Sequence, residues 1–369
     1  MNFLSIVILC FAILGAIDYI IGNKIGVGAE FENAFYLFAP MALTMIGMLV
    51  IAPAIGVWLS PLFDGFYNLF GIDPSIIPAS LFANDMGGAA LAQSIFKSEQ
   101  IGKYNAFVIS TMMGCTMSFN IPFGLGVVKK EQHPDFFFGL ICGIATIPLG
   151  SFVAGLICGI NPLLLLINLL PLIIISVAVT LMLIFVPKIA IKCFSVFGVF
   201  MKILCIVGLA IAIFTHLTGI IISPHFDSLE SAAIICVYAC ITLAGALPAM
   251  YLISKLLQKP LNMLGGKIGI NAVSTLGFLG SLVTNTSSYG VMDKMDKKGV
   301  ILNSAFAVSA SFVFGAHLAF TMAVDSSYIL PVIVGKILSG ICAVILALIL
   351  TGKNVNNTDK SDESVAVLK

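Results

Sequence analysis

The chain has 369 residues, of which 60% are hydrophobic and only 9% are charged, and its mean hydropathy is +1.12. Charged residues make up about a quarter of an ordinary soluble domain, so this composition excludes one and predicts a polytopic membrane protein surrounded by the lipid bilayer. The net charge of +1 rests on lysine, and arginine is absent, so a surface that binds nucleic acid is not expected.

Apolar runs of about the twenty residues that a bilayer requires recur along the chain. Nine are predicted to cross the membrane, at about 3–22, 36–60, 104–128, 136–160, 163–187, 194–222, 231–255, 300–323 and 329–351. The first lacks a basic start and a small-residue cleavage site, so we expect a retained helix and not a signal peptide. Asp18, near its end, is expected at the membrane interface. The polar tail 352–369 is expected to be disordered.

Two weaker apolar runs, 75–96 and 269–290, carry polar residues where a membrane helix would be apolar. The first contains Asn84-Asp85-Met86-Gly87-Gly88. A carboxylate in hydrocarbon costs about 3 kcal/mol or more, and the two glycines weaken the helix at the same point. Asp85 is therefore the first candidate for the counter-ion of a cationic substrate. The alternative is a structural carboxylate that pairs with Lys336 or with backbone amides at the start of a half-helix.

Another polar stretch lies inside the predicted span 104–128. Pro122 removes a backbone donor and frees carbonyls one turn earlier, while Ser118 and Asn120 offer replacement hydrogen bonds. We expect this helix to be kinked or unwound there, either around a ligand or as a proline kink without one.

The two halves of the chain match weakly but in order. At an offset of 198 residues Gly47 meets Gly245, and at an offset of 201 Asn84 meets Asn285, Gly114 meets Gly315 and Phe119 meets Phe320. An ancient duplication leaves such a pattern. Membrane transporters built from two repeats hold their substrate near the bilayer midplane between them.

The loop lysines distinguish two topologies, because lysine collects on the cytoplasmic side. If 75–96 and 269–290 both cross, there are eleven transmembrane spans and the lysines divide almost evenly. If both are re-entrant hairpins, nine spans remain, and one side holds every loop lysine except Lys97 and Lys103. The second arrangement fits better and places the C-terminus in the cytoplasm. Eleven spans remain the alternative.

With two hairpins the structural repeats are inverted in an all-α membrane fold. The first repeat covers 1–160, a connecting span covers 161–193, the second repeat covers 194–351, and 352–369 form a cytoplasmic tail. Both hairpin tips are then expected to meet the polar breaks of the neighbouring spans at mid-membrane. The substrate-binding side chains predicted there are Asn84, Asp85, Ser118, Phe119, Asn120, Asn285, Thr286, Tyr289 and His317.

This set suits a small cation that carries a hydroxyl. The carboxylate faces the ammonium, amides and hydroxyls face the hydroxyl, and aromatic rings add cation–π contacts worth about 2 kcal/mol when desolvated. His317 is weighed as a ligand or proton carrier against a structural donor. Lys336 either extends toward the membrane surface or pairs with an acid such as Asp85.

The sequence lacks the motifs of nucleotide binding, metal binding and catalysis. The sequence has no phosphate loop and no zinc-type spacing of histidine and cysteine, and its nine cysteines are interpreted as buried apolar residues, so no cofactor or metal is expected. An ATP-driven pump is disfavoured on the same ground. An enzyme would need a nucleophile and a base within reach of each other, and only His317 of the four histidines lies among polar groups within a span, so an enzyme is not expected.

Four stretches of the sequence are distinctive: Leu81 to Gly88, Met112 to Gly114 with Phe119 to Pro122, Met292 to Asp296, and Asn303 to Ala310. They resemble the EutH family of ethanolamine permeases, over about residues 11 to 351. The resemblance implies a bacterial inner-membrane protein that imports ethanolamine, an ammonium with a hydroxyl. At Gly315-Ala316-His317 no acid precedes the histidine, which departs from the family pattern, so a second acid in the site is not carried over.

The predicted function is therefore alternating-access import of ethanolamine across the bacterial inner membrane, with Asp85 as counter-ion. A channel-like facilitator and an ion-coupled carrier of another small cationic or polar solute are the alternatives. Whether the protein forms a homodimer is left open.

Overall fold

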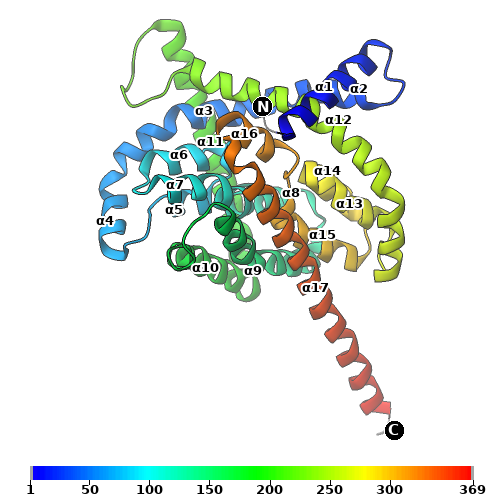
Figure 1. The fold of residues 1–369 in the computed structure, drawn as a ribbon. Helices are drawn as coiled ribbons and strands as arrows, with labels where there is room; N and C mark the ends of the chain where they lie inside the picture. The colour runs from blue at the N-terminus through cyan, green and yellow to red at the C-terminus, as the bar shows by residue number, and fades with distance from the viewer. Residues whose placement is uncertain (1–2, 367–369) are drawn as a thin grey trace.

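The computed structural model describes the backbone of residues 3–366 and the side chains of residues 4–351, and no strand occurs in that part of the chain (Figure 1). The α-helices are α1 (Phe3–Ile20), α2 (Val27–Tyr36), α3 (Phe38–Trp58), α4 (Ser60–Phe70), α5 (Ile76–Leu81), α6 (Gly88–Ile95), α7 (Glu99–Tyr104), α8 (Ile121–Val127), α9 (His133–Ile157), α10 (Pro162–Phe185), α11 (Pro187–Thr218), α12 (Leu229–Ile268), α13 (Ala272–Val283), α14 (Asn285–Tyr289), α15 (Lys297–Ala310), α16 (Ala316–Val324) and α17 (Ile329–Ala366). The shorter 3-10 and π-helical pieces are η1 (Asn84–Met86), η2 (Asn105–Gly114), η3 (Thr116–Asn120), η4 (Lys130–Gln132), η5 (Met292–Lys294) and η6 (Ser326–Tyr328). The all-α class is confirmed. The expected disorder of 352–369 falls outside the residues whose side chains are described and stays a prediction.

Within the described residues, seven helical stretches are long and apolar enough to cross a membrane, by length and composition. They are Val27–Trp58, Glu99–Val127, Lys130–Ile157, Pro162–Phe185, Pro187–Thr218, Leu229–Ile268 and Ser326–Thr351. Two of the nine predicted spans are not among them, because 3–22 forms the shorter α1 and 300–323 is divided into α15 and α16. The multi-pass membrane class is confirmed, with seven spans by this measure.

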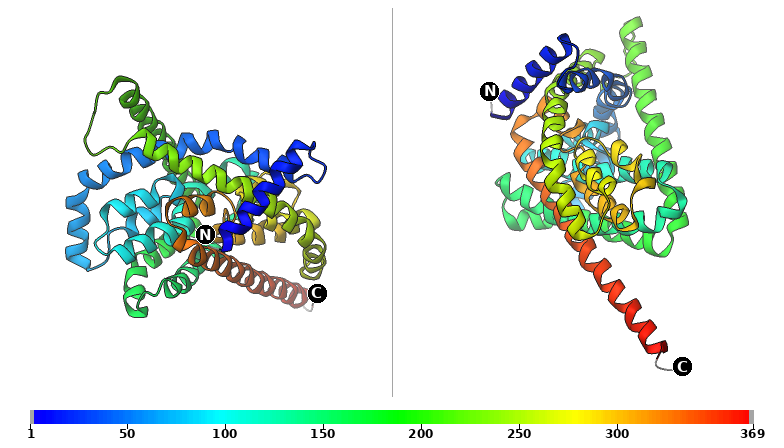
Figure 2. Two further views of the ribbon diagram at one scale, coloured as in Figure 1. Left: turned by 45° about the horizontal axis from the view of Figure 1, so that its top comes forward. Right: turned by 90° about the vertical axis from the view of Figure 1, so that its right-hand side faces the viewer.

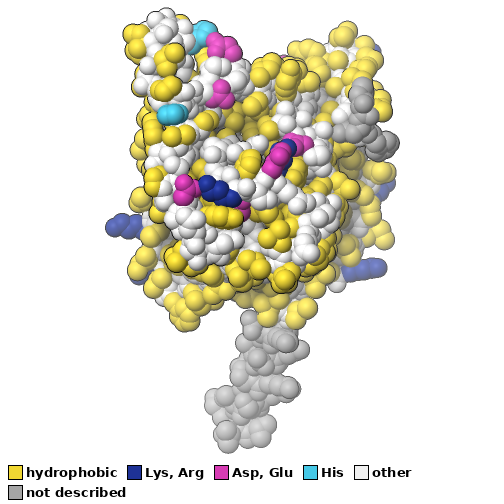
Figure 3. Space-filling view, turned by 60° about the vertical axis from the view of Figure 1, so that its left-hand side comes forward, with side chains coloured by type: hydrophobic (Ala, Val, Ile, Leu, Met, Phe, Trp, Pro, Cys, Tyr) yellow, Lys and Arg dark blue, Asp and Glu magenta, His cyan; other side chains and the backbone are white. Residues whose placement is uncertain are grey.

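The outer surface is apolar, as contact with lipid requires. Figure 3 shows one face on which hydrophobic side chains dominate and charges are few. Helix α11 lies along an edge of the molecule (Figure 2, right panel, green). Large apolar side chains exposed on α10 and α11 include Leu163, Ile174, Phe185, Val196 and Ile203. An exposed apolar surface of this extent marks a membrane-facing region.

Asp18 is buried within the protein, and its expected place at the membrane interface stays a prediction. Its carboxylate accepts hydrogen bonds from the backbone amides of Ile25 (2.9 Å), Gly26 (3.0 Å) and Gly28 (2.8 Å). It thus stabilises the turn between α1 and α2, because it satisfies amides that the start of α2 leaves without helical partners.

The first weakly apolar segment, 75–96, is divided. The turn η1 separates α5 from α6, and Gly87 between them has a left-handed φ of +93°, which glycine adopts without strain. Before the segment, Asp73 accepts hydrogen bonds from the backbone amides of Lys97 (2.9 Å) and Ser98 (2.8 Å), which follow it. The two ends of the segment therefore lie side by side.

The second weakly apolar segment, 269–290, is divided into α13 and α14, which meet at Thr284. Asp296, after the segment, accepts hydrogen bonds from the backbone amide of Asn271 (2.8 Å) and the hydroxyl of Ser274 (2.7 Å) at its start. One aspartate thus joins the two ends of each segment.

Asp296 makes a pH-dependent contribution to stability. Burial acts to raise the pKa of its carboxyl, but hydrogen bonds from Asn271, Ser274 and Gly299 outweigh it and hold the pKa below its ordinary value. A depressed pKa stabilises the fold above the unfolded value of about 4, and this stabilisation is lost as pH falls through the folded value. We expect Asp296→Asn to lose on the order of 1 kcal/mol at about pH 7, and less at about pH 3, after allowing for solvent screening.

Thermal unfolding of wild type and Asp296→Asn in detergent at both pH values measures this difference. Asp293→Asn is the control. Asp293 is an exposed aspartate close to Asp296 in the chain, so its substitution should change stability little. A loss that persists unchanged at low pH, or an equal loss in the control, would contradict the assignment.

The stretch 99–127 stays helical throughout, but it departs from α-helix where the break at Ser118 and Asn120 was expected. The backbone widens there into the π-helical pieces η2 and η3. Within this region the hydroxyl of Ser118 donates to the carbonyl of Gly114 (2.8 Å). A kink at Pro122 stays a prediction. Short π-helical stretches occur most often at functional sites.

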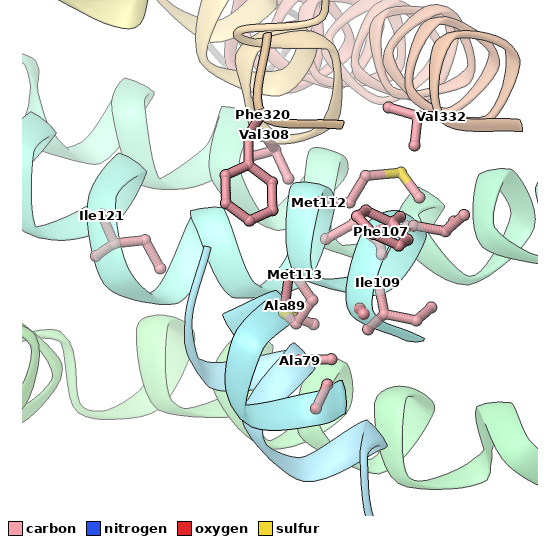
Figure 4. Close-up of a cluster of buried hydrophobic side chains, with 14 of the residues drawn as sticks. Ala79, Ala89, Phe107, Ile109, Met112, Met113, Ile121, Val308, Phe320 and Val332 are labelled. Carbon is pink, nitrogen blue, oxygen red and sulfur yellow. The ribbon is translucent and has the colours of Figure 1, made fainter. Parts of the chain in front are cut away.

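Every residue of η2 is buried, and the core is built around it. Figure 4 draws side chains of this core, among them Ala79 and Ala89 of the first divided segment, Phe107, Met112 and Met113 of η2, and Val308, Phe320 and Val332 of the second half. The η2 side chains lie between those two sets (Figure 4). Segments about 200 residues apart in sequence are therefore packed into one core.

Candidate functional site

A break in the chain between α15 and α16 lies at the centre of the candidate site. Phe312 adopts a left-handed φ of 60°, which is strained for a side chain of its size. Its amide donates to the carbonyl of Ser281 (3.0 Å), and the amide of Phe314 donates to the carbonyl of Leu282 (2.9 Å). These bonds attach the break to the end of α13. The predicted span 300–323 is thus broken just before Gly315.

The tip of the first divided segment lies against η2 and η3. The amide of Ala83 donates to the hydroxyl of Ser118 (3.1 Å). Gly114 passes so close to the tip that a Cβ there would lie 2.0 Å from the carbonyl oxygen of Phe82. Only glycine permits this approach.

Asparagines join the two halves of the chain. Asn84 donates its side-chain amide to the carbonyl of His317 (3.4 Å), and Asn285 donates to the side-chain oxygen of Asn120. Asn120 in turn donates to the carbonyl of Ala307 (3.3 Å). The two tips therefore lie beside polar residues of the other half of the chain, and the side chains of Asn84, Asn120, Asn285 and His317 are all buried.

Three ionisable side chains form a row within this polar region. Asp85 Oδ1 lies 3.9 Å from His317 Nε2, and the other ring nitrogen, Nδ1, lies 3.2 Å from the Lys336 ammonium. Lys336 also donates to the carbonyl of Thr111. The side chain of Asp85 is 17% exposed, whereas those of His317 and Lys336 are buried. Lys336 therefore does not extend to the membrane surface.

The row bears on the two interpretations of Asp85. Among the described side chains, no ion pair joins Asp85 to Lys336 directly, because the His317 ring lies between them. An ammonium has only hydrogen-bond donors, so Nδ1 accepts from Lys336 and the ring proton is on Nε2, facing Asp85. At 3.9 Å that contact is too long for a hydrogen bond. Asp85 thus keeps acceptor capacity for a further group.

Aromatic rings connect the row to the amides. Phe312 lies 5.0 Å from the His317 ring and 5.4 Å from Phe119, measured between ring centres. Phe119 stacks on Phe123, which stacks on Tyr289 at 6.2 Å. The predicted ligands Phe119 and Tyr289 therefore belong to this cluster.

Nine buried side-chain polar atoms have no hydrogen-bond partner among the described residues, and three of them lie in this region: Asn84 Oδ1, Asn285 Oδ1 and Tyr289 OH. Buried polar atoms are nearly always paired, because an unpaired one costs about 1–3 kcal/mol. These three therefore keep hydrogen-bonding capacity beside the two tips.

A cavity of about 580 Å³ lies beside the first tip, lined by Met86, Ser118 and Phe119 together with α3, α8 and α11. A smaller cavity of about 300 Å³ lies beside the second tip, where Gly280, Val283 and Ser287 contribute to its lining. Each tip therefore borders its own cavity.

The predicted residues do not all converge. Thr286 is exposed and bonds only locally, to Thr284. Thr111, Ser311 and Phe312 belong to the site, since they contact Lys336, Asn120 and His317 respectively, and the sequence did not single them out. No local signal marks them, because a threonine in an apolar helix and a phenylalanine in a left-handed turn look ordinary in sequence. In the part of the chain that is described, no three His, Cys, Asp or Glu side chains lie close enough to hold a metal ion.

Comparison with known proteins identifies relatives along almost the whole chain. The family model for the ethanolamine utilisation protein EutH matches residues 1–350. A probable ethanolamine permease EutH of Listeria monocytogenes is 38% identical over 97% of this chain and 95% of its own length. Proteins of the same description from Salmonella typhimurium and Escherichia coli are each 32% identical, over 89% and 91% of this chain and 86% and 88% of their own lengths. No solved structure matches the chain.

Proposed function

The chain belongs to the EutH family, and we propose that it is a permease that imports ethanolamine across the bacterial cytoplasmic membrane. Membership in a permease family implies a transporter and not an enzyme. Asp85 carries the proposal, because it is a partly exposed carboxylate at the tip of a divided membrane segment, with no direct cation partner among the described side chains. A carboxylate persists in a membrane interior where it serves a partner or a ligand.

The neighbouring groups match the rest of ethanolamine. The substrate ammonium is placed against Asp85, and its hydroxyl against the unpartnered side-chain oxygens of Asn84 and Asn285. The Phe119 ring, on the wall of the larger cavity, offers a face to the cation. The residues that contact the substrate are held in place by neighbouring side chains. We assign this role to Ser118, Asn120 and Tyr289.

We propose that the two halves are inverted repeats, and close contacts at matched positions support this. A Cβ at Gly114 would lie 2.0 Å from the carbonyl oxygen of Phe82, and a Cβ at Gly315 would lie 2.0 Å from that of Val283. The offset is 201 residues for both members of the pair. The same backbone approach thus recurs in each half.

A second matched contact involves the outer helices. A Cβ at Gly47 of α3 would lie 1.9 Å from the carbonyl oxygen of Cys205 in α11, and one at Gly245 of α12 would lie 2.1 Å from that of Ile8 in α1. The pair α3 and α11 therefore packs as α12 and α1 do. On this basis α1 and α11 are equivalent elements of the repeats 1–160 and 194–351.

We propose that both divided segments return to the side from which they start. Ion pairs join Lys129 to Asp293 (3.3 Å) and Lys103 to Asp325 (3.6 Å). Segment 269–290 lies between the members of both pairs, so if it crossed the bilayer each pair would join loops from opposite sides of the membrane. Its return gives an even number of crossings within each pair, which supports a re-entrant hairpin there.

The hydrogen bonds from the amides of Lys97 and Ser98 to Asp73 hold the two ends of 75–96 together, which supports its return as well. With two hairpins, the bias of the loop lysines favours a cytoplasmic C-terminus.

Single cysteines at Lys97 and Lys298, placed in a variant without native cysteines, test this topology with a membrane-impermeant thiol reagent. We expect labelling from opposite sides, with Lys97 outside. Labelling of both positions from one side would exclude the two-hairpin arrangement.

Uptake of labelled ethanolamine into liposomes that contain the purified protein tests the function itself. Saturable uptake with counterflow of preloaded ethanolamine is expected of an alternating-access carrier. Linear uptake without counterflow would favour a channel-like facilitator. Absence of any uptake above empty liposomes would remove the proposed substrate.

A further inference from the structure

Lys336 is a buried cation without a carboxylate in contact. It lies in α17 with its side chain fully buried, and the partners of its ammonium are the carbonyl of Thr111 and the ring of His317. A charge removed from water costs several kcal/mol unless a nearby opposite charge compensates it. The nearest such charge along the row is Asp85, on the far side of the imidazole.

His317 couples the two charges. Its Nδ1 accepts from Lys336, and its Nε2 proton faces Asp85 across 3.9 Å. The imidazole ring therefore connects the ammonium of Lys336 to the carboxylate of Asp85. With an ammonium, a neutral imidazole and a carboxylate, the empty site has a net charge of zero.

We propose that Lys336 is the resident counter-cation of Asp85 and gives up one proton when a cationic substrate takes that place. This rests on the proposed function, because it requires a cation to bind at Asp85. The substrate adds one positive charge, and breaking one N–H bond of Lys336 removes one. The proton moves to His317 Nδ1 while Nε2 releases its own proton to solvent in the site, so the ring remains neutral. Lys336 is left as a neutral amine, and the net charge stays at zero.

No other charge facing Lys336 replaces it in this exchange. The titratable groups that act on it are Asp85 from η1, His317 from α16 and Cys115 between η2 and η3. Helices α9 and α15 also pack on α17, and there Thr146 and Ser309 present neutral hydroxyls that bond to Ser339 of α17. The proton balance of the site thus depends on the row itself.

Calorimetry of ethanolamine binding to the purified full-length protein tests this exchange. Titrations in two buffers with different heats of ionisation give the number of protons released per ethanolamine bound. We expect wild type to release close to one proton at about pH 6, and its Kd to fall as pH rises until Lys336 is already neutral before ethanolamine binds; the ligand amine stays protonated throughout.

Two substitutions separate proton exchange from a structural role. Lys336→Met is expected to bind ethanolamine with no proton release and a Kd that does not change with pH. Lys336→Arg keeps a permanent cation, so we expect binding weaker by at least about tenfold and again no proton release. Lys192→Met, on an exposed lysine of α11, is the control and should behave as wild type.

The outcomes distinguish this inference from the proposed function. Ethanolamine binding by wild type without proton release overturns the role of Lys336 and leaves the permease proposal standing. Failure of wild type to bind ethanolamine overturns both. If Lys336→Met does not fold, Lys336→Arg decides, and proton release that persists in it contradicts the inference.

Discussion

Ethanolamine transport is expected to fall about 100-fold or more when Asp85 is replaced by asparagine. The substitution keeps the size of the side chain and removes its charge, so a bound ammonium would be buried without a counter-ion. Breaking such a buried pair costs about 3–5 kcal/mol, and each 1.4 kcal/mol corresponds to a factor of about ten. Asp85 is partly exposed and lies beside His317. No other carboxylate among the described residues of the site can replace it as counter-ion.

Initial uptake rates in liposomes, normalised to the amount of folded protein, measure this loss. Asp64→Asn is the matched control, because Asp64 forms its ion pair with Lys97 at the surface and should matter little. Transport by Asp85→Asn at the wild-type rate would remove the counter-ion assignment, and an equal loss in Asp64→Asn would point to a general effect of charge.

The substitution Gly114→Val is expected to destabilise the fold strongly. Its Cβ would lie 2.0 Å from the carbonyl oxygen of Phe82 and 2.5 Å from that of Ala79, and neither backbone atom can rotate away as a flexible side chain could. Overpacking of a core usually costs about 1–3 kcal/mol, and we expect the upper end of this range or more, because backbone must move. The tip of the first divided segment would be displaced from η2.

Size-exclusion profiles and thermal midpoints of the detergent-solubilised protein measure the effect. Gly126→Val is the control, since a Cβ at that position meets no atom within 4 Å. Under the repeat proposal, Gly315→Val should fail in the same way as Gly114→Val, because its Cβ would lie 2.0 Å from the carbonyl oxygen of Val283. A folded Gly114→Val with the wild-type midpoint would show that the approach is looser than described.

Part of the site could be predicted from individual residues in the sequence. Asp85 stood out because a carboxylate in an apolar run has few explanations, and Asn84, Asn120 and Asn285 stood out for the same reason. The repeat offset drew attention to Gly114 and Gly315. The seven long helices also follow from runs of apolar residues.

Other features were misjudged because their causes are not local. The departure from α-helix before Pro122 was expected as a kink or unwound turn, whereas the structure has a wider, π-helical backbone there. Lys336 was expected to extend outward or to meet an acid, whereas it meets His317. Thr286 was expected in the site and is exposed.

Membrane residence, the α-helical class and the family were written in the sequence, because the preference for lipid and the length of a span add up along consecutive residues. Distinctive motifs such as Asp85-Met86-Gly87-Gly88 are likewise recognised from consecutive residues, and they identify the family. The pairing of Asn84 with His317, of Asn285 with Asn120, and the order of Asp85, His317 and Lys336 emerged only when the chain was folded. These contacts join residues far apart in the chain, and their geometry depends on how whole helices pack, which no local pattern of residues specifies.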